Sequence, residues 1–403
     1  MSTVVPSTNN ESKLDSVRDR FNDIFAHIAK TAGARDSSRE HPFAEVAELK
    51  AQGFGALRVP VDLGGAGISY TELMDIVIDL GKADPNIAHA FRNHFATIES
   101  ALLNPNAPTS RFFLEAAARG ETIGGAFSEL TTAVSGGADF STVFKRSGDR
   151  YSLTGTKHYT TGNLYADWLS VNAVRDDGKH AMATIPASRE GIERPLDWDG
   201  IGQRLTGSGS TKFTNVDVAP EEILDVQLDA RAYRAVFHQL YLSAVIAGIM
   251  ENIQDDAIAL VKNRSRNFYH GLADLPRQES GVQEIVGQIS TNAWIARTVV
   301  QEAARGFERC QQQERAHGDD EGSRMQSSLA AARVKVVVDE LGPVTANLLF
   351  EAGGGQTVRS GTYLDRHWRN IKTLSAHNPR VYKLRVIGDY ELNGAPLPRG
   401  GFF

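Results

Sequence analysis

The stretch GTYLDRHWRNIKTLSAHNPRVYK, residues 361–383, gathers side chains that could do chemistry. It contains five Arg or Lys residues, two His and one Trp, in a chain whose net charge is −6. His377 is the main candidate, because an imidazole titrates near neutral pH and can donate or accept a proton. Aromatic, apolar and acidic residues interrupt the cations, which does not suit a nucleic-acid groove. The stretch could still be a solvated basic face or the wall of an active site, and we expect Asp365 to pair with Arg366 or Arg369.

The composition limits the class of protein. A chain of 403 residues with 41% apolar content can bury a large core in two or three subdomains. The acidic balance disfavours nucleic-acid binding, which needs a basic surface. Cys310 is the only cysteine, so neither an internal disulfide nor a cysteine-rich metal site is expected. No signal peptide is readable, and the longest apolar run, 241–250, is about half of the roughly 20 residues that a membrane span needs. These features predict a soluble cytoplasmic protein that binds neither metal, membrane nor nucleic acid.

Three regions must position the candidate side chains. The first region is an N-terminal domain at 1–120. Within it, residues 12–120 are predicted to be helical, because Leu14, Val17 and Phe21 begin an apolar pattern with three- and four-residue spacing. Residues 121–228 show alternation, β-branched residues and Gly/Asp turns, which predict antiparallel strands. Residues 229–403 return to helical spacing. Long helices at 232–264, 282–316 and 325–351 predict a four-helix bundle.

Three motifs give these regions a resemblance to a known family. They are LRVPVDLGGAGISYTEL, the pair AFSE and GTKHYTTG, and FEAGGGQTVRSGTYLDRHWRN. In their order and spacing, the chain resembles the acyl-CoA dehydrogenase superfamily over essentially its whole length. The resemblance implies an α+β fold with an N-terminal helical domain, a middle antiparallel β-barrel domain and a C-terminal four-helix bundle. It also implies a flavin between the β domain and the bundle, and a homotetramer built as a dimer of dimers.

Within this superfamily the chain resembles the branch of reduced-flavin monooxygenases that oxygenate dibenzothiophene and related sulfur compounds. The likeness lies in GTKHYTTG, DWDGIGQRLTGSGSTKFTNV and LDRHWRNIKTLSAHNP. It implies a two-component system in which an NAD(P)H:flavin reductase supplies reduced FMN. Together with O2, this FMN would form a C4a-hydroperoxyflavin that oxygenates a small substrate, first of all at sulfur. FAD is the less favoured cofactor, although the glycines of FEAGGGQT do not exclude it.

Two base positions of the dehydrogenases hold no carboxylate here. A dehydrogenase needs a carboxylate to remove the α-proton of a thioester. The resemblance places Asn378 at the tail position of that glutamate, and no Asp or Glu lies between Arg231 and Met250, where other relatives carry it. This absence favours oxygenation over dehydrogenation.

The resemblance also assigns roles to individual residues. His377 is the expected proton donor or acceptor, Thr161 the hydroxyl that meets flavin N5, and His89 a flavin-site histidine. Ser128 matches a flavin-facing hydroxyl. Arg266, with Arg264 as the alternative, matches an arginine that reaches the neighbouring subunit's flavin phosphate.

Further residues are expected at the cofactor and the substrate. Arg369 and Asn370 are expected at the cofactor site, where they would brace the turn that delivers His377. The resemblance therefore implies that residues 361–383 form an active-site wall rather than a solvated basic face. The remaining substrate-pocket candidates are His94, Gly125, Trp198 and Asn378. Two of the positions depart from the branch, because Gly125 stands where its members have asparagine, and Leu374 where they have a second histidine. The glycine is expected to enlarge the cavity.

Three alternatives remain open. The chain could be a flavin-dependent N-hydroxylase of an amine or amino sugar, an FAD-dependent acyl-CoA dehydrogenase with a displaced base, or a non-catalytic flavin-binding protein.

Overall fold

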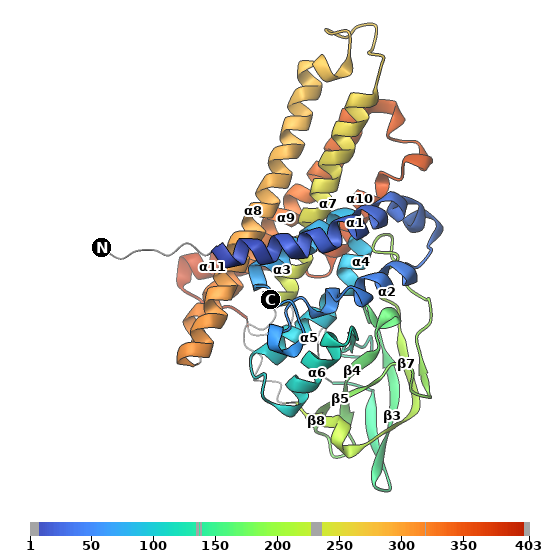
Figure 1. The fold of residues 1–403 in the computed structure, drawn as a ribbon, viewed down its shortest axis with the longest axis vertical. Helices are drawn as coiled ribbons and strands as arrows, with labels where there is room; N and C mark the ends of the chain where they lie inside the picture. Colours follow the sequence, from blue (N-terminus) through green and yellow to red (C-terminus); the bar gives the residue numbers. More distant parts are fainter. Residues whose placement is uncertain (1–7, 134–136, 138, 227–235, 319, 399–403) are drawn as a thin grey trace, which may run out of the picture.

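The computed structural model describes residues 8–133, 137, 139–226, 236–318 and 320–398. Figure 1 shows a sheet at one end of the molecule, a layer of N-terminal helices beside it, and long C-terminal helices that extend away from the sheet. This is the helical, sheet and helical order that the sequence predicted. The fold is the acyl-CoA dehydrogenase-like α+β fold expected from the resemblance.

The N-terminal region consists of helices, as predicted. Asp84 and Ser69 cap two of them through side-chain bonds to the backbone N–H of Asn86 and of Glu72. The cap at Asp84 starts the short helix that carries His89, and the next helix carries Arg92. The helices are α1 Thr8–Ser38, α2 Phe43–Ala51, α3 Tyr70–Ala83, α4 Pro85–Ala90, α5 Arg92–Leu102 and α6 Pro108–Ala118.

The central sheet has the pairing order β6-β7-β3-β2-β4-β5-β8, with β1 also paired to β4. It is mixed, because β1 and β2 run parallel to β4 whereas the other pairs are antiparallel. The expectation of antiparallel strands throughout is corrected in this respect. The strands are β1 Ile123–Ala126, β2 Val143–Ser147, β3 Arg150–Lys157, β4 Trp168–Arg175, β5 His180–Pro186, β6 Ile192–Glu193, β7 Thr211–Val218 and β8 Ile223–Asp225.

The C-terminal region forms the predicted helical bundle. The helices expected at 282–316 and 325–351 lie within α8 and α9, and the predicted start at 232 lies outside the described residues. The helices are α7 Val236–Asn263, α8 Ser280–His317, α9 Glu321–Gly353, α10 Asp365–Ala376 and α11 Arg380–Asn393. The described residues also contain short 3-10 turns: η1 Phe54–Ala56, η2 Val61–Leu63, η3 Asn163–Tyr165, η4 Pro220–Glu222, η6 Pro276–Gln278, η7 Gly354–Gln356 and η8 Ser360–Thr362.

The N-terminal helices and the bundle share one apolar core. Residues of α1, α3, α7, α8, α9 and α10 belong to a single buried cluster, and the sheet has a core of its own. Helix α7 has the length and composition of a membrane span, but 83% of its apolar window is buried inside the protein. That burial is typical of the core helix of a soluble protein. The domain limits at 120 and 228 stay a prediction, and residue 228 lies outside the described residues.

Candidate functional site

The turn between α10 and α11 brings His377 to the start of α5. Arg92 Nη1 lies 3.1 Å from His377 Nε2. A guanidinium only donates hydrogen bonds, so Nε2 accepts and the imidazole is neutral. The protein around the ring, and then the positive charge of Arg92, hold the pKa of His377 well below its usual range. His377 remains exposed, whereas Arg92 is buried.

His89 and His238 lie within electrostatic range of the same arginine. Burial and then Arg92 lower the pKa of His89 to about 3 and that of His238 to about 3. His89 Nδ1 lies 3.0 Å from Gln203 Oε1, an atom that only accepts, so Nδ1 carries the proton. His89 Nε2 is then a buried acceptor that has no hydrogen-bond partner among the described residues. The site therefore gathers three neutral imidazoles around one cation.

Gln203 joins the histidines to α10. Its N–H donates to Asn370 Oδ1 at 2.6 Å, and its carbonyl accepts from Trp198 Nε1 at 2.8 Å. Its φ of 51° is in the left-handed region, which is uncommon outside glycine and concentrates at functional sites. Next to it, Gly202 lies so close to α10 that a Cβ atom would stand 2.1 Å from the Arg369 carbonyl oxygen. The loop 195–209 is thus fixed on α10.

Arg369 and Asn370 brace this loop. Arg369 Nε bonds to Asp365 Oδ2 at 2.8 Å, which is the expected ion pair, and its Nη1 bonds to the Ile201 carbonyl at 3.0 Å. Its Nη2 bonds to Asp36 Oδ2 at 2.6 Å. The guanidinium is therefore engaged within the protein, and a direct role at the cofactor stays a prediction.

A row of hydroxyls connects Thr161 to Gln203. Thr161 Oγ1 lies 2.7 Å from Ser208 Oγ, which lies 2.6 Å from Thr206 Oγ1, and Thr206 donates to the Gln203 carbonyl at 2.9 Å. Each hydroxyl has one proton. Because Thr206 gives its proton to the carbonyl, Ser208 must donate to Thr206 and Thr161 to Ser208. Thr161 is left with lone pairs to accept a further hydrogen bond.

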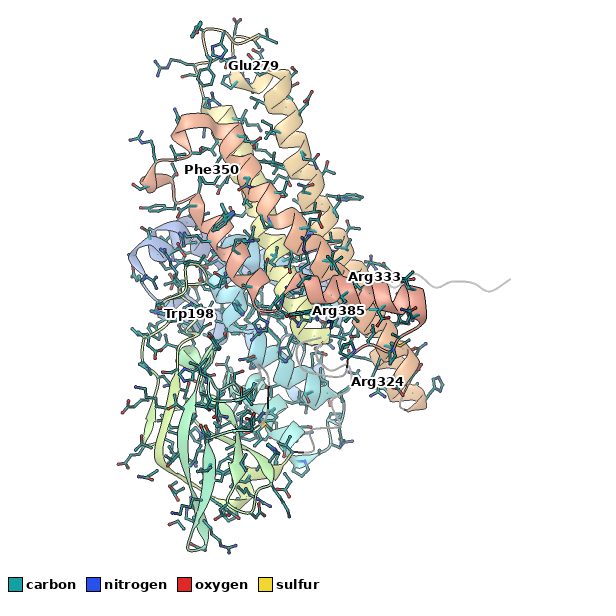
Figure 2. All side chains as sticks on the ribbon, turned by 180° about the vertical axis from the view of Figure 1, so that it is seen from behind. Trp198, Glu279, Arg324, Arg333, Phe350 and Arg385 are labelled. Atoms are coloured by element: carbon teal, nitrogen blue, oxygen red, sulfur yellow. The ribbon has the colours of Figure 1, made fainter. Side chains whose placement is uncertain are left out.

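Trp198 lies where the sheet meets the helical part of the molecule (Figure 2). It lines a hollow of about 120 Å³ together with Arg39, His41 and Arg204. The edge of its ring meets exposed Tyr159, with 6.2 Å between ring centroids. This placement agrees with an aromatic wall next to the HYTTG turn. Its contact with substrate or flavin stays a prediction.

A buried ion pair joins the segment that contains Ser128 to the end of β3, directly before the HYTTG turn. Lys157 Nζ lies 2.7 Å from Glu129 Oε1, and both side chains are buried. Despite burial, bonds from Lys157, Ser141 and Thr142 hold the pKa of Glu129 well below its usual range. Half-buried Ser128 accepts a hydrogen bond at its carbonyl from the His158 N–H at 2.9 Å. The pair thus connects the two segments predicted to face the flavin.

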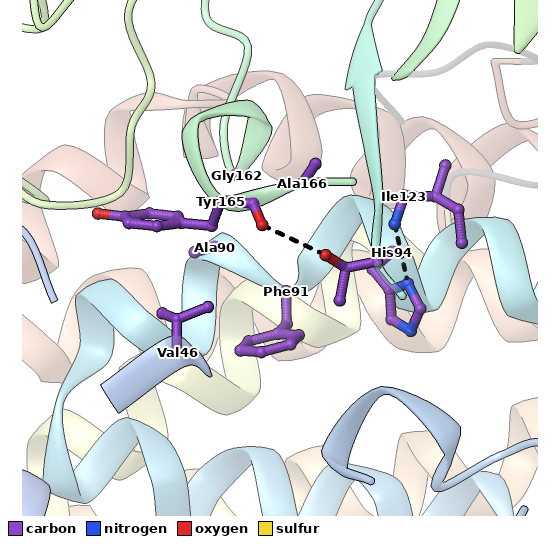
Figure 3. A pocket seen from close by; sticks show the side chains of 9 residues that line it. Val46, Ala90, Phe91, His94, Ile123, Gly162, Tyr165 and Ala166 are labelled. Atoms are coloured by element: carbon purple, nitrogen blue, oxygen red, sulfur yellow. Dashed lines mark hydrogen bonds between the residues drawn. The ribbon is translucent and has the colours of Figure 1, made fainter. Parts of the chain in front are cut away.

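His94 is held on both ring nitrogens by backbone groups. Nε2 donates to the Gly55 carbonyl at 2.8 Å, and Nδ1 accepts from the Ile123 N–H at 3.2 Å. Burial lowers its pKa to about 4. The ring lines the cavity in Figure 3, whose volume of about 10 Å³ is that of one water position. These contacts show a histidine that links α5 to η1 and β1, and its substrate role stays a prediction.

The other substrate-pocket candidates are placed differently. A Cβ atom on Gly125 would lie 2.4 Å from the Phe127 ring and 3.1 Å from Asn93 Nδ2. These two side chains occupy the space beside Gly125, so the glycine does not enlarge the cavity as expected. Asn93 Nδ2 also donates to the Thr161 carbonyl at 3.0 Å. Asn378 is buried directly after His377.

Arg266 is exposed in the segment after α7, and the next residue, Asn267, donates to Glu279 Oε1. Glu279 lies at the end of the molecule opposite the sheet (Figure 2). Arg264 Nη1 is bonded to the Ala352 carbonyl at 3.2 Å. Neither is brought to Thr161 or His377 within this chain. The predicted role at a neighbouring subunit's flavin stays a prediction. Among the described residues, no group of three or more His, Cys, Asp or Glu could hold a metal ion.

Two family models match the chain at the regions that build this site. Acyl-CoA dehydrogenase, N-terminal domain, matches residues 11–121, and Acyl-CoA dehydrogenase, C-terminal domain, matches residues 240–379. The chain belongs to the acyl-CoA dehydrogenase superfamily. The resemblance inferred from the motifs is confirmed.

Similar proteins within the acyl-CoA dehydrogenase superfamily are named as monooxygenases. The probable FMNH2-dependent monooxygenase SfnC of Pseudomonas putida is 29% identical over 378 residues, which cover 92% of this chain and 93% of that protein. The solved methanesulfinate monooxygenase MsuC of Pseudomonas fluorescens superposes with a TM-score of 0.86 at 28% identity, covering 96% of this chain and 99% of that one. FMN-bound TdsC, a dibenzothiophene monooxygenase from a Paenibacillus species, superposes with a TM-score of 0.83 at 25% identity, covering 94% and 99%.

Sequence reasoning missed four residues of this superfamily member's site: Arg92, His238, Gln203 and Ser208. Arg92 follows His89 by three positions, a spacing that suggests one helical face, but Phe91 separates two helices there. His238 interrupts the apolar start of α7, and a polar residue within an apolar run could have indicated a functional side chain. Gln203 and Ser208 lie in an irregular loop, where no periodicity points to a partner.

Proposed function

We propose that this protein is an FMNH2-dependent monooxygenase that uses O2 to oxygenate a small sulfur compound. The observation that carries the proposal is the composition of the site. Where a dehydrogenase needs a carboxylate base, this chain has Asn378, and the adjacent cluster consists of His377, His89 and His238 around Arg92. The monooxygenases SfnC, MsuC and TdsC, which are similar over more than 90% of the chain, support this reading.

The residues present fit a reduced flavin. Thr161 has unused lone pairs, because its proton is directed to Ser208, so its hydroxyl would accept a hydrogen bond from an N–H group of FMN. Ser128 and Trp198 would contact the same ring system, and Arg266 of a second copy would reach the phosphate. Bound reduced FMN would supply the electrons for the reduction of O2. FMN itself is favoured over FAD because the FMNH2-dependent relative is similar to this chain over nearly its full length.

His377 would manage the proton that accompanies oxygen transfer. Its neutral ring, with Nε2 held by Arg92, carries the exchangeable proton on Nδ1. Such acid–base groups typically contribute a factor of about 10² to 10⁴ to the rate. Trp198 and the fixed 195–209 loop would keep water from the reacting atoms.

Several features of the working enzyme belong to the same proposal. We infer that an NAD(P)H:flavin reductase supplies the reduced FMN, that the enzyme is a homotetramer and that it acts in the cytoplasm. The domain limits at 120 and 228 are the proposed boundaries of its three parts.

The test is oxygen incorporation. The purified protein is combined with FMN, a flavin reductase, NADH and isotopically labelled O2, and then with methanesulfinate or dibenzothiophene in separate reactions. Mass spectrometry should find one labelled oxygen atom in a product. A parallel reaction contains an acyl-CoA and an electron-accepting dye. Oxidation of the acyl-CoA without any labelled product would support the dehydrogenase alternative, and the absence of both reactions would support a non-catalytic flavin-binding protein.

A further inference from the structure

Arg92 is a buried cation without a carboxylate partner among the described residues. Only 7% of it is exposed, and its hydrogen-bond partner is His377. The one acidic group of the described residues that influences it is the Tyr241 phenol, which donates to the Ala88 carbonyl at 2.8 Å and whose pKa burial raises well above its usual value. Within the part of the chain that the structure describes, no negative charge balances Arg92.

Carboxylates neutralise buried Arg35 and mostly buried Arg58. Arg35 pairs with Glu45 at 2.8 Å and with Asp84 at 2.9 Å, and Arg58 pairs with Glu99. Burial of an unpaired charge is costly because the charge loses its hydration without gaining a counter-ion. The burial of Arg92 lowers its pKa to about 10, in agreement with that cost. Such a cation is retained at a functional site when a ligand completes it.

Unused hydrogen-bonding atoms lie next to the cation. Arg92 Nε and Gln203 Nε2 are donors that lack a partner among the described residues, and His89 Nε2 is an unpartnered acceptor. His89 is bonded to Gln203 and His377 to Arg92, and Arg92 lies close enough to both histidines to lower their pKa, so the four side chains form one cluster. Of the four residues, His377 is exposed, whereas Arg92, His89 and Gln203 are buried. The cluster offers charge and donors to an incoming group.

We propose that Arg92 is the counter-ion for a negatively charged group of the substrate, with the Gln203 amide as a second donor. This inference rests on the proposed oxygenase function and specifies its substrate class. The substrate would be a small organic anion such as a sulfinate, rather than a neutral thioether or a protonated amine. Arg92 and the neutral imidazoles provide no negative charge for an ammonium group, which disfavours the N-hydroxylase alternative.

Binding to the protein alone tests the site without oxygenation. The probes are propane-1-sulfonate, an unreactive anion, and methyl propyl sulfone, a neutral compound of similar shape, each titrated by calorimetry. The sulfonate should bind at least about tenfold more tightly, and added salt should weaken only the sulfonate. Arg92→Gln should weaken sulfonate binding at least tenfold, and Arg92→Lys should retain most of it. Arg111→Gln, at an exposed arginine paired with Glu115, should change nothing.

Equal binding of the two probes, or an unchanged sulfonate affinity in Arg92→Gln, would refute the proposal. Circular dichroism and the Lys variant separate lost folding from lost charge. If sulfonate binding depends on Arg92 but no labelled product forms in any oxygenation assay, the anion site stands and the oxygenase function fails.

Turnover distinguishes an anion site from a structural role in holding His377. In the Arg92→Gln variant, kcat/KM for propane-1-sulfinate should fall at least tenfold more than kcat/KM for methyl propyl sulfide, with the main change in KM. A merely structural arginine would lower kcat for both compounds equally, and that result would overturn the assignment.

Discussion

Arg92 donates a 3.1 Å hydrogen bond to His377 although the two residues are 285 positions apart in the chain. Arg92 is the first residue of α5 in the N-terminal region, and His377 directly follows the last residue of α10 in the bundle. The bond fixes the tautomer of the imidazole, because the guanidinium can only donate and Nε2 must accept. The junction of two helical regions thereby determines the protonation state of the proposed catalytic histidine.

Replacement of His377 tests its proposed role in proton transfer. His377→Ala should lower kcat for oxygenation by about 100-fold or more, since acid–base groups contribute 10² to 10⁴ to the rate. The variant should fold normally, because His377 is exposed. Steady-state product formation measures the effect, and His270→Ala, at an exposed histidine in the segment between α7 and α8, is the matched control. Wild-type turnover in His377→Ala would remove the residue from the mechanism.

The row of hydroxyls formed by Thr161, Ser208 and Thr206 predicts how tightly flavin oxidation is coupled to product formation. Thr161→Val should raise the yield of hydrogen peroxide per flavin consumed, because no oxygen atom remains to accept a hydrogen bond from the flavin. Thr161→Ser should retain coupling. Ser208→Ala should have an intermediate effect, since the Thr161 proton loses its acceptor. A peroxide assay beside product analysis gives the ratio, and identical ratios in all three variants would contradict the assignment.

The Glu129–Lys157 pair makes a prediction about stability. Glu129→Gln should lower the free energy of unfolding by about 3–5 kcal/mol, because it leaves the buried Lys157 ammonium without its counter-ion. The double variant Glu129→Gln with Lys157→Met should be more stable than the single one. Urea denaturation at pH 7 measures both. A single variant as stable as the wild type would mean that the pair contributes nothing.

The buried histidines predict that acid destabilises the protein. Burial lowers the pKa of His94 to about 4 and, together with repulsion by Arg366, that of His367 to about 4, whereas an unfolded histidine titrates near 6.5. The unfolded state therefore binds more protons, and stability present above pH 6.5 is lost as the pH falls toward 4. Each such histidine contributes up to about 1.4 kcal/mol per pH unit. Urea titrations between pH 7.5 and 5 should show this loss, and His94→Gln should reduce the slope. A flat profile would refute the prediction.

The contact between the 195–209 loop and α10 leaves no room for a methyl group. Gly202→Ala should displace the loop and lower the melting temperature by several degrees, because its Cβ would overlap the Arg369 carbonyl. Gly361→Ala is the matched control, since no heavy atom lies within 4 Å of its added Cβ. Calorimetry compares the two variants. Equal melting temperatures would show that the loop is not fixed at this point.

The sequence predicted the helical regions well because their periodicity is local. Apolar spacing located α8 and α9 within a few residues, and the motif order predicted the superfamily. The direction of β1 and β2 relative to β4 was not predictable, because strand direction is set by pairing between residues far apart in the chain.

The site was predicted in part. The structure brings His377, His89 and Asn370 together with Arg92 and Gln203, and a row of hydroxyls extends from Gln203 to Thr161. His89 and His94 occur in one short motif, but α4 ends between them, so their spacing could not show that backbone groups hold His94 on both nitrogens. Arg92 was not predicted, because only the folded structure shows which described residues surround its guanidinium and that no carboxylate is among them.

The left-handed backbone at Gln203 has a practical consequence for protein engineering. A 195–209 loop transplanted from a homologue will fit only if its residue at position 203 can bond to both His89 and Asn370, since these two residues lie far apart in the sequence. A chimaera of two homologues should therefore take positions 89, 203 and 370 from the same parent.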